Sequence, residues 1–221
     1  DNFCRRNSFP ITLVEDILTK SNLTLEDLPS CAKISVKRDN VSLPISINLS
    51  EKLLEMLGLY LAEGYARKNN SKKGFYHVSI AVTDKKIKKM VKDVFFIYFG
   101  LEPSEDHPDH LTFSSKLLYE LFISYLGFGL GAKNKRIPSM FLNLKRDKIA
   151  AFLRGYYEGD GSVSETDIRV VCDTTSEGLK YDLSFVLSRF GLFTKFYEYE
   201  KKPGPIVREF YLRKNKKIPK F

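Results

Sequence analysis

The sequence predicts an α+β fold of two similar halves, in which the order helix, strand, helix, strands recurs. Patterns typical of helices and strands occur in the same order twice between residues 48 and 213. Two segments, residues 57–64 (LGLYLAEG) and 154–161 (RGYYEGDG), align without a gap. Their spacing of roughly 100 residues is too long, and two copies too few, for a solenoid. We therefore expect two halves related by a pseudo-twofold axis.

The chain of 221 residues divides into three segments, and its 43% hydrophobic composition excludes disorder for most of it. Residues 1–47 form an accessory segment that three prolines interrupt and that has one helical stretch, residues 13–18. Residues 48–144 form the first repeat and residues 145–221 the second. Because the second repeat lacks a closing helix, we expect the natural chain to continue beyond it.

An apolar helix opens the first repeat. Asn48 and Glu51 have the spacing of a capping box, and the helix ends at Gly64. Alternating aromatic and β-branched residues then predict a strand over 74–82, and Thr83 or Asp84 caps the next helix. The later elements are that helix to about Phe99, a polar turn over 102–109, a strand over 111–113, a helix over 115–126 and a flexible glycine-rich connector over 127–131.

The second repeat follows the same order. Its elements are a helix from about Arg146 to Gly161, a strand over 168–172, an amphipathic helix over 177–190 and two alternating strands, 193–200 and 206–212, joined by a turn over 201–205.

The two aligned segments share a face of small residues. Gly58 and Ala62 lie four residues apart in the first, and Gly155 and Gly159 in the second, so each pair falls on one side of its helix. An interior glycine destabilises a helix by ~1 kcal/mol relative to alanine, and a compensating interaction is therefore required. Close packing of the two helices at the centre of the fold supplies it.

An acid and a glycine follow in each segment: Glu63 with Gly64, and Asp160 with Gly161. If the helices pack together, the two carboxylates meet at the negative ends of two helix dipoles and repel each other unless a divalent cation lies between them. Oxygen ligands without His or Cys favour Mg²⁺ over zinc, and these four residues form the candidate metal site for hydrolysing a phosphodiester. The alternative is two ordinary helix C-caps with solvated acids.

The charge of the chain favours a polyanionic partner. The formal net charge is +9, and residues 195–221 carry nine Lys and Arg against three Glu. Nucleic acid is the first candidate and an anionic membrane the second, although many basic proteins are simply soluble. No apolar run reaches the ~18 residues of a membrane helix, so we expect no membrane partner. Three scattered cysteines favour a reducing compartment, and we expect a cytoplasmic protein.

Residues 57–64 and 153–161 resemble the two signature helices of the LAGLIDADG (dodecapeptide) homing endonucleases, in the form that has both motifs in one chain. The resemblance covers about residues 48–213 and implies two αββαββ repeats, the first with a closing helix. Their antiparallel sheets would form a saddle that lies on DNA. It also implies a monomeric endonuclease, intein-borne, intron-encoded or free-standing, that uses Mg²⁺ or in its place Mn²⁺. Such an enzyme hydrolyses both strands of a long, specific double-stranded site and leaves short 3′ overhangs. By position, Glu63 and Asp160 would be its metal ligands.

Family members often place a lysine near each active site, and residues 133–138 (KNKRIP) are similar to the segment that carries one in intein-borne members. The resemblance favours Lys135, followed by Lys133, as the group that polarises the attacking water or balances charge on the phosphate. A loop that only contacts phosphate is the alternative. Residues 214–219 (KNKKIP) repeat the pattern directly after the last strand, which leaves the second lysine unassigned.

Residues alternate between the two faces of a strand, so basic, polar and aromatic side chains on one face of each sheet are expected to contact DNA. The candidates are Arg67, Lys68, Lys72, Lys73, His77, Lys133 and Arg136 in the first repeat, and Arg169, Lys195, Tyr197, Lys201, Arg208 and Arg213 in the second, with Ser79, Tyr199, Lys202 and Tyr211 as further members.

Two other functions are compatible with the sequence. The main alternative is a non-catalytic nucleic-acid-binding protein of the same fold, either an RNA maturase or a DNA-binding regulator. A carbohydrate hydrolase with Glu63 and Asp160 as acid and base is a third possibility. A zinc site at His107 and His110 is disfavoured, because no third ligand has a suitable spacing.

Overall fold

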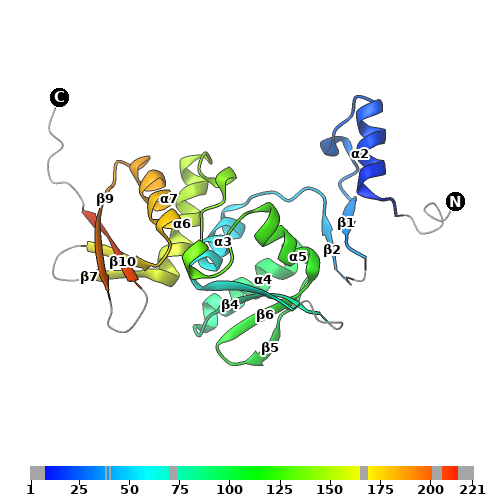
Figure 1. The fold of residues 1–221 in the computed structure, drawn as a ribbon. Coiled ribbons are helices and arrows are strands. Elements are labelled where there is room, and N and C mark those ends of the chain that lie inside the picture. The colour runs from blue at the N-terminus through cyan, green and yellow to red at the C-terminus, as the bar shows by residue number, and fades with distance from the viewer. Residues whose placement is uncertain are drawn as a thin grey trace.

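Two helices, α3 (Glu51–Glu63) and α6 (Arg146–Asp160), lie side by side at the centre of the protein, which we describe from a computed structural model (Figure 1). Each half of the chain extends from one of them to its own sheet. The structure describes residues 8–37, 39, 41–69, 74–164, 169–200 and 206–213.

The two central helices touch backbone to backbone. A Cβ atom on Gly58 would lie 1.9 Å from the carbonyl oxygen of Phe152, and one on Gly155 would lie 1.8 Å from the carbonyl oxygen of Glu55. Neither position has room for a side chain, because the obstacle is the backbone of the facing helix. The close packing expected from the small residues is therefore present.

The two halves have sheets of the same topology. The first sheet has the order β3-β4-β6-β5 and the second the order β7-β8-β10-β9, with every pair antiparallel. The strands are β3 (Gly64–Lys68), β4 (Tyr76–Ala81), β5 (Ser104–His107), β6 (His110–Ser114), β7 (Gly161–Ser164), β8 (Arg169–Thr174), β9 (Phe193–Glu200) and β10 (Ile206–Arg213). Helix α4 (Lys85–Phe99) joins the strand pairs of the first half and α7 (Glu177–Ser188) those of the second. The expected α+β fold of two repeats is confirmed.

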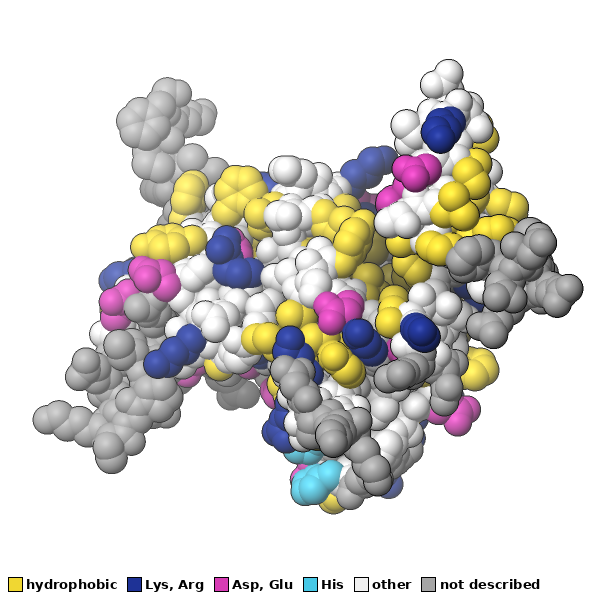
Figure 2. All heavy atoms as spheres, turned by 45° about the vertical axis from the view of Figure 1, so that its right-hand side comes forward, with side chains coloured by type: hydrophobic (Ala, Val, Ile, Leu, Met, Phe, Trp, Pro, Cys, Tyr) yellow, Lys and Arg dark blue, Asp and Glu magenta, His cyan; other side chains and the backbone are white. Residues whose placement is uncertain are grey.

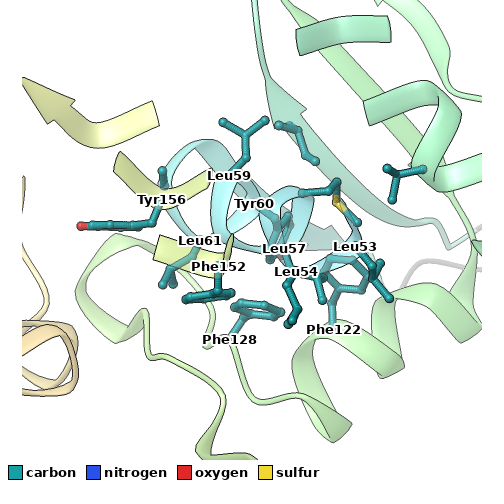
Figure 3. Packing of buried hydrophobic residues seen from close by; sticks show 14 of the residues in the cluster. Leu53, Leu54, Leu57, Leu59, Tyr60, Leu61, Phe122, Phe128, Phe152 and Tyr156 are labelled. Atoms are coloured by element: carbon teal, nitrogen blue, oxygen red, sulfur yellow. The ribbon is translucent and has the colours of Figure 1, made fainter. Parts of the chain in front are cut away.

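Helix α3 is buried on almost every side, as an all-round apolar helix must be. The ring of Tyr60 meets Phe122 edge-on at 4.6 Å between centroids and Phe128 at 5.0 Å. Figure 3 shows the rings of Phe122 and Phe128 beneath α3, together with Phe152, which α6 contributes. The core therefore joins both central helices to the connector between the halves.

The accessory segment carries α2 (Ile11–Lys20), a 3₁₀ turn (Leu25–Asp27) and a two-stranded sheet of β1 (Lys33–Ser35) and β2 (Ser42–Pro44). Asp39 ties it to the first half, because its carboxylate accepts hydrogen bonds from the Ser115 hydroxyl at 2.9 Å and the Leu117 amide at 2.8 Å. Those groups begin α5 (Lys116–Glu120).

Between the accessory segment and the first half lies an open cavity of about 620 Å³, lined by Ile11, Leu25, Leu43, Leu117 and Tyr125 among others. Figure 2 shows hydrophobic side chains gathered around this hollow and along the outer face of α2.

Several predicted element boundaries were wrong. Ser50, and not Asn48, caps α3, because its hydroxyl accepts a hydrogen bond from the Leu53 amide. The predicted strands omitted β3 and β7, which start on the glycine after each acid, and β5, which lies in the expected polar turn. The helix expected over 115–126 is α5 followed by a π-helical turn, Leu121–Tyr125. The hairpin turn 201–205 lies outside the described residues.

No helix among the described residues is long and apolar enough to span a membrane.

The contact between the helices predicts that Gly58→Ala and Gly155→Ala each destabilise the protein by about 2 kcal/mol or more, since the new Cβ forces two backbones apart. In an exposed helix the same change would stabilise by ~1 kcal/mol. Urea unfolding measures the difference, with Lys52→Ala on the exposed side of α3 as the control. A glycine variant as stable as Lys52→Ala would contradict the close contact.

Candidate metal centre and DNA-binding face

The two motif acids meet where their helices end. Glu63 is the last residue of α3 and Asp160 the last of α6. The Glu63 Cγ lies 2.9 Å from the position that a Cβ on Gly159 would take, so the absence of a side chain there lets Glu63 approach Asp160. The structure therefore brings together two carboxylates from different halves.

The glycines after the acids are not left-handed helix caps. Gly64 has φ −86° and Gly161 φ −84°, and each begins a strand directly. A Cβ on Gly64 would lie 2.3 Å from the carbonyl oxygen of Tyr60, and one on Gly161 2.2 Å from that of Tyr157. The glycines are required for this sharp passage from helix to strand, and the acids are held at the corner.

Lys135 is the basic residue at this corner. Its side chain is half-buried, and its Nζ donates a hydrogen bond to the carbonyl oxygen of Ala62, next to Glu63. Burial lowers the pKa of Lys135, while the charges of Asp160 and Glu63 oppose that shift. Lys133, in the 3₁₀ turn Ala132–Asn134, is exposed, so of the two candidates Lys135 is the one at the acids.

Burial raises the pKa of Asp160 to about 6. Lys135 acts against the shift, as does the Tyr156 hydroxyl, and the negative charges of Glu63 and Asp173 add to it. The corner therefore has an excess of negative charge that a single half-buried lysine does not balance.

The loop that carries Lys135 begins with the glycine-rich connector, residues 127–131, whose backbone conformation depends on glycine. Gly127, Gly129 and Gly131 all have positive φ, between 77° and 82°. At Gly129 a Cβ would also collide with the carbonyl oxygen of Asn134, at 1.8 Å. A cavity of about 150 Å³ opens between this loop and the end of α3, lined by Gly64, Lys135 and their neighbours.

Comparisons with known proteins agree with the fold. The model of a LAGLIDADG-like domain matches residues 147–218. The structure is similar to that of I-DmoI in complex with DNA and Mn, with a TM-score of 0.56 and 18% identity over 75% of this chain and 91% of that chain. The complex of I-DmoI with DNA and Ca gives a TM-score of 0.54 and 17% identity over 76% and 85%. Residues 147–218 are therefore a LAGLIDADG-like domain, and the chain as a whole has the LAGLIDADG fold.

The curated relatives are much longer than this chain. The DNA polymerase II large subunit of Thermococcus kodakarensis is 33% identical over 197 residues, which are 87% of this chain and 10% of that protein. A DNA polymerase of Thermococcus sp. is 32% identical over 148 residues, 66% of this chain and 8% of that protein. The chain thus spans about a tenth of the length of these relatives.

The donors at this LAGLIDADG corner suit a hard divalent cation. Among the described residues, no group of three His, Cys, Asp or Glu could enclose a metal ion. At the corner itself, the carboxylates that could bind one are those of Glu63 and Asp160. Mg²⁺ is commonly held by one or two carboxylates together with waters and substrate phosphates. His107 and His110 lie at the β5–β6 turn with their Nδ1 atoms 3.4 Å apart.

The sheets of this LAGLIDADG fold present basic and aromatic groups on the face opposite the core. In the first sheet Arg67 pairs with His77 across β3 and β4, while the neighbouring Val78 is fully buried on the other face. The guanidinium of Arg67 lies 4.6 Å from the centre of the Tyr65 ring. In the second sheet the ammonium of Lys195 lies 4.8 Å from the centre of the Tyr197 ring.

The other candidates for DNA contact differ in their surroundings. Lys68 is exposed, Arg169 is half-buried, and Arg136 binds Asp182. Lys72, Lys73, Lys201 and Lys202 lie outside the described residues, and so do the side chains of Tyr199, Arg208, Tyr211 and Arg213. The strand register pairs Arg208 with Glu198 and Tyr211 with Lys195. Ser79 is buried and bonds Thr112.

Four residues near the site had no signal in the sequence. Tyr156 and Asp173 act on Asp160 through space, and Ser176 and Asp182 hold the Lys135 loop from α7. Some of these residues are far from their partners in the sequence, and none has a side chain that is unusual for its helix or strand. Only the tertiary structure therefore reveals their role.

The excess of negative charge predicts that Asp160→Asn raises the free energy of unfolding by about 1 kcal/mol in EDTA at pH 7, since a buried, repelled charge is removed. Mg²⁺ should then stabilise the unmodified protein more than the variant, because a ligand stabilises the state that binds it. Urea unfolding with and without Mg²⁺ measures both effects, with Asp93→Asn on the exposed side of α4 as the control. A variant less stable than the unmodified protein in EDTA would contradict the expected charge imbalance.

Proposed function

We propose that this protein is a site-specific endonuclease that hydrolyses both strands of double-stranded DNA with Mg²⁺, or Mn²⁺ in its place, and leaves short 3′ overhangs. The observation that carries the proposal is the pair of acids from two halves, Glu63 and Asp160, held at one corner, with Lys135 bonded to the end of α3 and within reach of both charges. Two sheets with exposed basic and aromatic residues flank that corner, as an enzyme needs when it cuts two strands.

The residues at the corner would divide the chemistry as follows. Glu63 and Asp160 would hold the metal ion, with the backbone at Gly64 and Gly161 fixing the corner. A bound divalent ion supplies a more acidic water and neutralises charge on the scissile phosphate. Lys135 orients the attacking water or stabilises the phosphate as negative charge develops. Arg67, Lys195 and Tyr197 bind the DNA backbone and bases on either side.

The relatives support a role as an inserted element. The chain matches a tenth of a DNA polymerase II large subunit, 18% of an RNA polymerase subunit of Methanocaldococcus jannaschii, and, over 66 residues, 6% of a translation initiation factor of Thermococcus kodakarensis. A segment shared by proteins of such different function is best explained as an insertion. We propose that this chain is the endonuclease portion of an intein and works inside the cell as a monomer.

A cleavage assay tests the proposal directly. The substrate is a plasmid that carries the host gene without the segment that encodes this chain, because an inserted element spreads only if the uninterrupted copy is cut. We expect Mg²⁺ to give a linear product with short 3′ overhangs, visible by gel electrophoresis and end sequencing.

Glu63→Gln and Asp160→Asn should each slow double-strand cleavage on the order of 10³-fold while DNA binding is kept, since each removes charge from the reacting centre. Glu158→Gln is the matched control, because it neutralises an exposed acid two residues before Asp160. An unmodified protein that binds this DNA without cutting it in Mg²⁺ or Mn²⁺ would instead support the non-catalytic alternative. An equal loss of cleavage rate in Glu158→Gln would contradict a specific role of Glu63 and Asp160.

The exposed strand face predicts a salt effect. Lys195→Ala should weaken DNA binding and reduce the slope of log affinity against log salt by about one, because one phosphate contact is lost. Fluorescence anisotropy at several salt concentrations measures the slope. Lys89→Ala, on α4 at the opposite side of its sheet, is the control, and an equal change there would exclude the strand face as the binding surface.

A further inference from the structure

The loop that delivers Lys135 is held by the helix of the opposite half. Asp182 of α7 is buried, and its Oδ2 accepts hydrogen bonds from Arg136 Nε at 2.6 Å and from the Ile137 amide at 3.1 Å. Its Oδ1 accepts a third from Arg136 Nη2 at 2.8 Å. One carboxylate therefore fixes both the side chain and the backbone of the two residues that follow Lys135.

A second anchor holds Lys135 itself. The hydroxyl of Ser176, which is 1% exposed, donates to the carbonyl oxygen of Lys135 at 2.7 Å and accepts from the Leu179 amide at 3.1 Å. The residue that begins α7 is thus also the residue that fixes the backbone of Lys135. A displacement of the start of α7 would therefore act directly on the backbone of Lys135.

The first turn of α7 is shaped to receive this loop. A Cβ on Gly178 would lie 2.4 Å from Arg136 Cδ, so the glycine leaves the space in which the arginine lies. The buried position of Asp182 keeps it away from DNA, and the ion pair with Arg136 satisfies a charge that burial would otherwise penalise. Three residues of one helix thus converge on three successive residues of the loop.

We propose that Ser176 and Asp182 are positioning residues, which fix Lys135 against the end of α3 and so make the lysine at the acid pair depend on the second half. This inference rests on the proposed nuclease function. The ammonium of Lys135 reaches α3 of the first half, whereas its backbone belongs to a loop fixed on α7. A long lysine side chain has high rotamer entropy, and a fixed backbone reduces the number of positions available to its ammonium.

The test compares Asp182→Asn and Ser176→Ala with the unmodified protein in single-turnover cleavage. We expect each variant to lower the cleavage rate about tenfold or more without changing KM or DNA affinity, because displacing a reacting group by about 1 Å is costly to the rate. Glu55→Gln is the matched control, since it breaks the Glu55–Arg154 pair between the halves, at 2.9 Å, without touching the loop.

The decisive measurement repeats Asp182→Asn in a Lys135→Met background. A residue that acts through Lys135 should cause no further loss of rate there, whereas a residue that merely stabilises the fold should cause the same loss in both backgrounds. Equal losses in the two backgrounds, or a rate unchanged by both anchor variants, would overturn the proposal.

Hydrogen exchange gives a result that does not depend on activity. Amides of residues 132–138 should exchange at least about tenfold faster in Asp182→Asn, while those of α3 keep their protection. Unchanged exchange in the loop would refute the anchoring even if cleavage falls. An unmodified protein without nuclease activity would refute the proposed function instead, and the exchange experiment would still decide whether α7 holds the loop.

Discussion

The contact between the backbones of α3 and α6 is the constraint on which the rest of the structure depends. It places Gly58 against Phe152 and Gly155 against Glu55 at distances that only glycine allows. Two helices this close must end close together, so the residue at the end of each is delivered to the same corner. The position of Glu63 beside Asp160 is a consequence of packing that begins a turn or more earlier in each helix.

The same constraint explains the unfavourable electrostatic energy at the corner. Two carboxylates at the negative ends of two helices repel, and burial raises the pKa of Asp160 further. A fold selected for stability alone would place neutral side chains there. The unfavourable charge is tolerated because the core beneath it is large: Tyr60 of α3 packs on Phe122 and Phe128, and Phe152 of α6 packs on Phe141.

The sequence predicted what depends on local pattern and on repetition. The aligned glycines revealed the helix contact, and the acids after them revealed the corner, because both signals occur twice at the same spacing. The strands β3 and β7 were missed, since each is short, begins on glycine and lacks an apolar alternation to mark it. Ser176 and Asp182 were missed for another reason: their partners lie about 40 residues away, and neither side chain is unusual for its helix.

The two halves have the same topology but cannot hold a lysine in the same way. In α7 the cap is Ser176, the space is at Gly178 and the acceptor is Asp182. The corresponding positions of α4, counted from its cap, are Asp84, Lys86 and Met90. Asp84 uses one carboxylate oxygen for the amides of its own helix, Lys86 carries a side chain where Gly178 has none, and Met90 offers no charge to a basic residue. An anchor built like that of Lys135 is therefore absent from α4, and any lysine that serves the corner from the second repeat must be fixed by different contacts.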